Sequence, residues 1–368
     1  MNRLSAIAAI GILAIVGVVA QPPKPKTTRH VTATGTQPKF KAIFEPVNYP
    51  HDSDLHDVVF VSRDIGWVVG STHSDAGDGG VLLHTTDGGD HWNAQVGDPH
   101  SGTREFEKLF FLDATHGWAT EAGGGVLLKT TDGENWETVN SSFSPWGSFV
   151  FTTPDVGLYL DGQNILRSQD GGRSWNQVYA CRARVQVDGL AREEVCKFQS
   201  IHFPTPQIGY ASTGNLANHA SAIAKTVDGG LTWNLVGYME NASAMDRGLF
   251  FSDANTGFAR TYQGNLLKTA DGGLTWKGAT TAPAGPIRFA NHDVGWVARG
   301  TTIAYTADGG KRWNTAEVRF PAQVFSSSFP TPDRGYVVGE HGMIYRYRIV
   351  PFDYKVSGMI SAPAIAAH

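Results

Sequence analysis

The chain has 368 residues, of which 41% are hydrophobic and 17% are charged, and its formal net charge is −4. This composition is typical of a globular protein with one large or two ordinary domains, and the balance of charge gives no reason to expect a nucleic-acid partner. The chain also holds 43 glycines and 10 tryptophans. Glycine turns combined with regularly spaced aromatic residues favour an all-β repeat fold.

The N-terminus has the features of an export signal. Arg3 supplies a positive charge, residues 4–19 form an uninterrupted run of apolar and small residues, and Val18-Val19-Ala20 offers a cleavage site. We therefore predict a signal peptide over residues 1–20 and an exported protein that is periplasmic or secreted. The alternative is an uncleaved N-terminal segment that tethers the protein, although the apolar run is short for a membrane-spanning helix.

The segment after the signal peptide has the composition of a linker. Residues 21–38 are rich in Pro, Thr and Lys, which is typical of a flexible tether. The folded domain is expected to span residues 39–350, and residues 351–368 are expected to form a C-terminal tail.

A glycine followed by a large apolar residue recurs at intervals of 38 to 52 residues. An apolar run precedes each glycine, and a further apolar run such as residues 126–129 follows it. This period is typical of a four-stranded propeller blade, with strands A to D in chain order. The seven copies that open strand B are Gly66-Trp67, Gly117-Trp118, Gly157-Leu158, Gly209-Tyr210, Gly257-Phe258, Gly295-Trp296 and Gly335-Tyr336.

A second element, the Asp-box, follows strand C in six of the repeats. Its pattern is Ser/Thr-x-Asp-x-Gly-x-x-Trp, and the second copy is one residue shorter. We expect it to form the C–D turn, with a carboxylate that accepts backbone N–H groups, glycines that permit positive φ, and a tryptophan that packs between neighbouring sheets. The aspartate and tryptophan of each copy are Asp87 and Trp92, Asp132 and Trp136, Asp170 and Trp175, Asp228 and Trp233, Asp271 and Trp276, and Asp308 and Trp313.

The alternative role for the six aspartates is catalysis. A catalytic pair requires two carboxylates that converge on one point, whereas these aspartates would be spread around a ring. The pattern therefore favours a structural role.

The two ends of the folded domain complement each other. Residues 324–348 supply strands A, B and C but no Asp-box, and residues 40–45 form a strand without preceding partners. Pairing them would remove the open sheet edges that make β folds prone to aggregation. We therefore predict an all-β, seven-bladed β-propeller of four-stranded antiparallel blades, closed by the N-terminal strand.

Cys181 and Cys196 are the only cysteines of the chain. In an exported protein such a close pair is expected to form a disulfide, and two free thiols in a loop are the alternative. The longest insertion between repeats contains this pair and three arginines, Arg182, Arg184 and Arg192.

At these motifs the sequence resembles the Asp-box propellers, also called bacterial neuraminidase repeats, which occur in sialidases, xyloglucanases and sortilin-type receptors. The repeated phrase Gly-Trp, then Gly-x-Leu-Leu-x-Thr-Thr-Asp-Gly-Gly-x-x-Trp, is most similar to the photosystem II stability/assembly factor family. The resemblance covers about residues 40–350. It implies an assembly chaperone that binds a membrane protein or its precursor through a basic patch, although no residue-level motif for that patch can be matched here, and fold alone does not fix activity.

Blade topology indicates which face would bind a partner. In a four-stranded antiparallel blade the A–B and C–D turns lie on one face, and the B–C and D–A turns lie on the opposite face. The Asp-boxes thus share one face, and the long insertions lie on the other, which we call the loop face. Loops on a rigid scaffold commonly carry function. The insertions are residues 71–80, 97–106, 179–199, 213–222 and 237–247.

Three groups of residues on the loop face are candidate binding residues. Arginines can pair with acidic groups of a partner, and loop aromatic residues can anchor a contact. The alternatives are solvated loop charges, scattered salt-bridged arginines, and aromatic packing against an adjacent blade. The candidates are Arg182, Arg184 and Arg192 in the long insertion, Arg247, Arg260, Arg288 and Arg299 as a basic rim of the channel mouth, and Trp146 and Tyr262.

An enzyme is the rival class of function. The chain lacks the Arg-Ile-Pro segment of sialidases, and it has one propeller where Asp-box xyloglucanases have two. A glycosidase would require two carboxylates that meet in the central mouth, with Glu121 and Asp161 as the nearest candidates. We expect a non-enzymatic, monomeric scaffold that docks a protein partner, without metal, other cofactor or nucleic acid. A glycan-binding or sialidase-like propeller is the alternative.

Overall fold

The computed structural model describes residues 39–352, except 73–78, 97–104, 123–124, 144–147, 215, 218, 240–243, 262–264 and 282–284. The described part of the chain contains no helix that is long and apolar enough to cross a membrane. The predicted signal peptide, the linker and nearly all of the C-terminal tail lie outside the described residues. The sheets described below belong to one compact unit, which begins at Phe40.

The structure contains seven four-stranded antiparallel sheets and one separate two-stranded hairpin. We number the sheets as blades 1 to 7 in chain order. Blade 1 consists of β2 (Ser53–Phe60), β3 (Gly66–Thr72), β4 (Gly79–Thr85) and β5 (Asn93–Val96), and blade 2 of β6 (Phe106–Phe111), β7 (Gly117–Glu121), β8 (Leu127–Thr130) and β9 (Trp136–Asn140). Blade 3 consists of β10 (Phe149–Phe151), β11 (Gly157–Asp161), β12 (Asn164–Ser168) and β13 (Asn176–Ala180), and blade 4 of β16 (Phe198–His202), β17 (Gly209–Thr213), β18 (Ser221–Thr226) and β19 (Asn234–Met239).

The last three blades follow the same plan. Blade 5 consists of β20 (Ala244–Phe251), β21 (Gly257–Thr261), β22 (Asn265–Thr269) and β23 (Lys277–Thr281), and blade 6 of β24 (Ile287–Phe289), β25 (Gly295–Arg299), β26 (Thr302–Thr306) and β27 (Asn314–Thr315). Blade 7 consists of β28 (Val324–Thr331), β29 (Arg334–Gly339), β30 (Ile344–Phe352) and the N-terminal strand β1 (Lys39–Pro46). The predictions of four-stranded antiparallel blades and of closure by the N-terminal strand are therefore confirmed.

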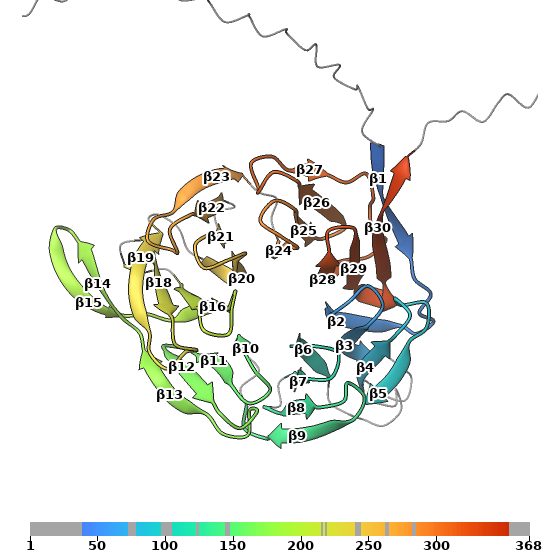
Figure 1. Cartoon of the computed structure of the whole chain (residues 1–368), viewed down its shortest axis with the longest axis horizontal. Coiled ribbons are helices and arrows are strands. Elements are labelled where there is room, and N and C mark those ends of the chain that lie inside the picture. Colours follow the sequence, from blue (N-terminus) through green and yellow to red (C-terminus); the bar gives the residue numbers. More distant parts are fainter. Residues whose placement is uncertain are drawn as a thin grey trace, which may run out of the picture. The chain divides into compact units, whose positions relative to one another are not determined.

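The blades are arranged around a central opening (Figure 1). Their innermost strands contact one another in the order β2, β6, β10, β16, β20, β24 and β28, and β28 returns to β2. The hairpin, formed by β14 (Arg182–Val187) and β15 (Leu190–Val195), lies outside this ring between blades 3 and 4 (Figure 1).

One phenylalanine at the end of strand A organises each blade. In blade 1 the ring of Phe60 lies parallel to that of Tyr336 from blade 7, with 3.4 Å between centroids. The Asp-box tryptophan of the same blade, Trp92, meets Phe60 edge-on at 6.0 Å. A Cβ at Gly66 would lie 2.5 Å from the Phe60 ring. The strand-B glycine is thus required because the phenylalanine occupies the space of its side chain.

The same arrangement recurs around the ring. The phenylalanine lies six residues before each strand-B glycine, and the strand-B aromatic residue of the preceding blade stacks on it. The pairs are Trp67–Phe111, Trp118–Phe151, Tyr210–Phe251, Phe258–Phe289 and Trp296–Phe329, with centroid distances of 3.5 to 4.3 Å. Since each pair joins two blades, the stacks stabilise the ring as well as the individual sheets.

Blade 3 departs from the pattern because its strand B begins with Gly157-Leu158. Leu158 is fully buried in a core cluster against which Phe203 of blade 4 packs. The indole Nε1 of Trp118 donates to the carbonyl of Gly171 in the next blade at 2.9 Å. Leucine offers no such donor. Instead Arg167, which lies opposite Leu158 in the sheet, donates from Nε to the carbonyl of Gly229 at 3.1 Å.

We predict that Gly257→Ala will lower the free energy of unfolding by about 1–3 kcal/mol, the usual effect of overpacking a core. The added Cβ would lie 2.6 Å from the ring of Phe251. Gly278→Ala, in the same blade, is the matched control because its Cβ would meet no atom within 4 Å. Urea unfolding of both variants measures the difference. Equal midpoints would show that the glycine is not required by the phenylalanine.

Candidate binding site

Each Asp-box is a closed set of hydrogen bonds. In blade 4, Oδ1 of Asp228 accepts the Thr232 N–H at 3.0 Å and the Thr226 hydroxyl at 2.8 Å, and Oδ2 accepts the Thr232 hydroxyl at 2.6 Å. The Thr226 hydroxyl oxygen in turn accepts the Gly230 N–H at 3.0 Å. Equivalent bonds to Oδ1, from the box Ser/Thr hydroxyl and a backbone N–H, surround Asp87, Asp132, Asp170, Asp271 and Asp308. The carboxylates are therefore occupied within their own turns.

These bonds favour the charged form of the carboxylates. The hydroxyl and backbone N–H of Thr275, followed by the hydroxyl of Thr269, lower the pKa of Asp271 to about 2. For Asp228 burial acts in the opposite direction, but the bonds from Thr232 and Thr226 outweigh it and lower its pKa to about 2. A low pKa with all bonds made locally is what a structural carboxylate requires.

The central cavity has a volume of about 550 Å³ and is lined by the inner strands. None of the six box aspartates lines it, and Asp57 is the one carboxylate among its described lining residues. Asp57 accepts the Ser326 hydroxyl at 2.6 Å and the Leu109 N–H at 3.1 Å. It thereby links blades 7, 1 and 2. Glu121 and Asp161, the predicted candidates for a catalytic pair, are absent from the lining.

The cavity also contains basic groups. Lys108 of blade 2 and Arg288 of blade 6 line it, together with His202 of blade 4. Burial, and then the positive charge of Arg288, lowers the pKa of His202 to about 4. Nδ1 of His202 accepts the Phe251 N–H at 3.2 Å, so the neutral ring carries its proton on Nε2.

Two of the predicted loop-face arginines come from adjacent blades. Arg260, in β21, is 2% exposed, and its Nε and Nη1 have no hydrogen-bond partner among the described residues. Burial, and then the charge of Arg299, lowers the pKa of Arg260. Arg299 is exposed and ends β25. Both lie at the B–C ends of their blades, and neither forms an ion pair with another residue in the described part of the chain.

The four arginines predicted as one basic rim do not all lie together. Arg288 lines the central cavity from strand A, whereas Arg260 lies one residue before the end of strand B and Arg299 is the last residue of strand B. Strand A is the innermost strand of each blade and strand B is the second. Residues of these two strands can therefore share a face of the ring and still lie at different distances from its axis. The side chain of Arg247 lies outside the described residues, as do Trp146 and Tyr262.

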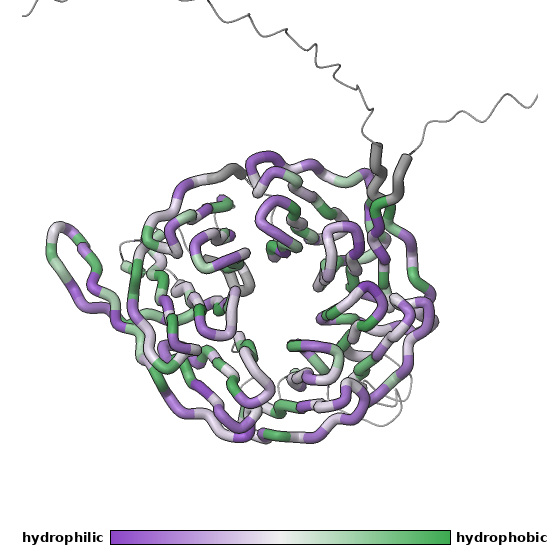
Figure 2. The backbone as a smooth tube through the Cα atoms, in the orientation of Figure 1, coloured by the Kyte–Doolittle hydropathy of each residue, from purple (hydrophilic) through white to green (hydrophobic). Residues whose placement is uncertain are grey.

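The hairpin β14–β15 carries the other predicted arginines. Cys181 and Cys196 form a disulfide at its base, as predicted. Ala183 and Val185 are buried in the core cluster between blades 3 and 4, and the alternation along the hairpin is visible in Figure 2. The opposite face therefore points away from the ring.

The arginines of the hairpin are exposed but divided between its two faces. The register places Arg184 opposite Glu193 and Arg192 opposite the buried Val185. Arg182 pairs with Glu193 at 3.1 Å. Arg182 and Arg184 thus share the outward face, and Arg192 belongs to the other. The hairpin consequently presents a mixed rather than a purely basic surface.

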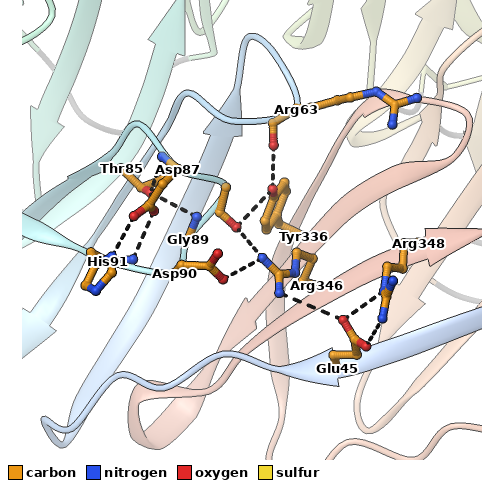
Figure 3. Close-up of polar contacts among 11 residues, drawn as sticks. Glu45, Arg63, Thr85, Asp87, Gly89, Asp90, His91, Tyr336, Arg346 and Arg348 are labelled. Carbon is orange, nitrogen blue, oxygen red and sulfur yellow. Dashed lines mark hydrogen bonds and ion pairs between the residues drawn. The ribbon is translucent and has the colours of Figure 1, made fainter.

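Sequence reasoning missed a second group of arginines on the Asp-box face, where β1 closes the ring. Arg346 and Arg348 of β30 lie beside Glu45 of β1 and Asp90 of the first Asp-box (Figure 3). The pattern Arg346-Tyr-Arg348 in a blade without an Asp-box could have indicated them. In the described part of the chain no three or more His, Cys, Asp or Glu side chains are grouped as metal ligands.

Comparisons with known families and sequences agree with this architecture. The family model described as "Photosynthesis system II assembly factor YCF48" matches residues 37–148. The photosystem II assembly protein Ycf48 of Synechococcus sp. (strain JA-3-3Ab) is 39% identical over 59 residues, which are 16% of this chain and 18% of that protein. The photosystem II stability/assembly factor HCF136 of Arabidopsis thaliana is 25% identical over 334 residues, covering 80% of this chain and 75% of that protein.

Solved structures share the fold. A structure titled "YCF48 bound to D1 peptide" has a TM-score of 0.58 and 18% identity, covering 83% of this chain and 96% of that one. A xyloglucanase from Xanthomonas campestris also has a TM-score of 0.58, with 14% identity over 82% of this chain and 53% of that one. The chain is a β-propeller related to photosystem II assembly factors.

We predict that Asp228→Asn will lower the melting temperature by about 2–4 °C, the shift expected for roughly 1 kcal/mol in a domain of this size. The amide retains one acceptor oxygen, so the Thr232 N–H and hydroxyl can no longer both be satisfied as before. Calorimetry measures the shift. Loss of partner binding without any change in melting temperature would contradict the structural role of this box.

We also predict that stability decreases as the pH falls from about 4 toward 2. The pKa values of Asp87, Asp228 and Asp271 are about 2 in the folded state, below the ordinary value of about 3.9. Their contribution is therefore present above pH 4 and is lost as the unfolded chain takes up protons first. Urea midpoints at pH 5 and pH 3 measure this. Replacing all three by Asn should flatten the dependence, and an unchanged slope would exclude these carboxylates as its source.

Proposed function

We propose that this chain is an exported, non-enzymatic scaffold with a seven-bladed ring that docks a membrane protein or its precursor through the loop face. The seven four-stranded sheets and the closed order of their inner strands support the count of blades. The apolar N-terminal run supports export, and the disulfide fits an oxidising compartment. The relationship to photosystem II assembly factors supports a role as an assembly scaffold.

The observation that carries the docking proposal is Arg260. A buried guanidinium group with unsatisfied donors is costly, and a carboxylate supplies the matching acceptors. Arg299 beside it adds charge that would attract an acidic segment. The solved YCF48 structure that contains a D1 peptide shows that a protein of this fold can hold a peptide. By analogy, an acidic stretch of the partner would engage Arg260 and Arg299.

The central cavity does not favour hydrolysis of glycosides. Both stereochemical courses require a pair of carboxylates, and the described lining offers Asp57 alone, which is already hydrogen-bonded between blades. The likeness to a xyloglucanase at 14% identity extends to the fold. A glycan-binding function therefore has less support than protein docking.

The test compares capture of proteins from solubilised host membranes by three forms of the protein. The wild type and Arg173→Gln are expected to enrich the same membrane protein, and Arg260→Met combined with Arg299→Gln is expected to lose it. Arg173 is the control because it is an exposed arginine of an Asp-box, paired with Glu137 at 2.7 Å. Equal capture by all three forms, or release of reducing sugars from xyloglucan by the wild type, would contradict the proposal.

The double variant is expected to fold, because methionine replaces a buried charge that has no ion-pair partner among the described residues by an apolar side chain of similar length. Its melting temperature should equal or exceed that of the wild type. A lower value would show that Arg260 stabilises the free protein, and the docking role would then lose its main support.

A further inference from the structure

Blade 7 differs from the other blades at the junction with blade 1. The residue before the strand-B glycine is Ile65, His116, Val156, Ile208, Thr256 or Val294 in blades 1 to 6. In blade 7 it is Arg334. Strand C of this blade also continues as β30 instead of turning into an Asp-box, which places Arg346 and Arg348 on the sheet face that carries Arg334 and Tyr336. Three arginines therefore gather on one sheet face of blade 7.

These residues line a pocket of about 500 Å³, which we call the seam pocket. Its lining consists of Glu45, Pro46, Arg334, Arg346 and Arg348. It lies on the Asp-box face, beside the first Asp-box and opposite to the arginines of the proposed docking site. The seam pocket is thus independent of the proposed function.

Two of the three arginines have partners (Figure 3). Arg348 donates to both carboxylate oxygens of Glu45, from Nε at 2.9 Å and from Nη2. Arg346 donates from Nη1 to Asp90 at 2.7 Å and to the Gly88 carbonyl at 3.2 Å, and its Nη2 lies 3.9 Å from Glu45. Nε of Arg346 is buried and has no partner among the described residues.

Arg334 has no ion-pair partner of its own in the described part of the chain, and Glu45, which interacts with it electrostatically, is already paired with Arg348. The side chain of Arg334 contacts the hydroxyl of Tyr336, no carboxylate in the described part of the chain lies within ion-pair distance of it, and its Nε is buried without a partner among the described residues. The register places Arg334 directly opposite Arg348. Like charges in directly opposed positions destabilise a sheet. The nearby Arg63 and Asp333 neutralise each other, so the excess charge remains.

We propose that the seam pocket binds a phosphate group. The three guanidinium groups of the lining are offset by two carboxylates, Glu45 and Asp90, the partner of Arg346, which leaves a formal excess of one positive charge to attract a phosphate anion. Guanidinium groups bind phosphate oxygens through paired N–H donors, and Nε of Arg334 and of Arg346 have donors to offer. Because the pocket joins β1 to β30 and to blade 1, bound phosphate would hold the ring closed. Free phosphate and a lipid headgroup present the same chemistry.

The test measures binding of inorganic phosphate by calorimetry, and melting temperature in phosphate and in chloride at equal ionic strength. The wild type is expected to show saturable binding and a melting temperature that rises with occupancy. Arg334→Gln should weaken binding by about tenfold or more, the loss expected for one charge-assisted contact. Arg173→Gln, which removes an arginine from another Asp-box region, should bind as the wild type does.

Without phosphate, Arg334→Gln should melt no lower than the wild type, because it removes one member of a like-charged pair. This control separates loss of a ligand contact from loss of folding. A rise in melting temperature that never saturates, or equal binding by Arg334→Gln and the wild type, would overturn the proposal. Vesicles of phosphatidylglycerol and of phosphatidylcholine distinguish the sources: sedimentation with the former that requires Arg334 would assign a lipid headgroup, and its absence alongside phosphate binding would assign the free anion.

Discussion

The ring depends on a phenylalanine placed over a glycine. The glycine at the start of strand B leaves room for the phenylalanine that ends strand A, and the ring of that phenylalanine then lies flat against an aromatic residue of the preceding blade. The contact joins two strands and two blades at once. Six such stacks, and a contact of Phe203 with the cluster of Leu158 at the seventh junction, follow each other around the circle, so each blade is held by its neighbours on both sides.

The same feature explains what could be predicted from sequence. The glycine, the strand-B aromatic residue and the Asp-box recur at fixed spacing, and each is specified locally, so the order of strands and the closure by β1 were predictable. The role of Phe60 and its counterparts was not, because a phenylalanine at a strand end is unremarkable until its partner, which lies in another repeat, is known. The disulfide was predictable because its two cysteines are 15 positions apart within one insertion.

The candidate site residues were harder to predict, because their surroundings depend on the distance from the axis of the ring as well as on the face of the ring. Topology places Arg260, Arg288 and Arg299 on the correct side of each blade, but only the structure separates a cavity-lining strand-A residue from the ends of strand B. Burial adds a second difficulty. The sequence does not indicate that Arg260 is buried with unsatisfied donors while Arg182 is exposed and paired with Glu193. Burial matters because an unsatisfied donor away from water costs free energy that a ligand can recover.

The difference between the six Asp-box blades and blade 7 indicates where a ligand could bind. In blades 1 to 6 the Asp-box carboxylate accepts its hydrogen bonds within its own turn, so it is already occupied before any ligand arrives. Blade 7 has no Asp-box, its strand β30 pairs with β1, and among the described residues Glu45 and Asp90 form ion pairs with the arginines of that junction. The closure of a ring from two chain ends therefore creates a junction that differs from the junctions between the Asp-box blades. The residues at this junction do not have to form an Asp-box turn. Arginines can therefore occupy positions there that the sequence of the Asp-box would otherwise fix, and their positive charge exceeds the negative charge of the nearby carboxylates.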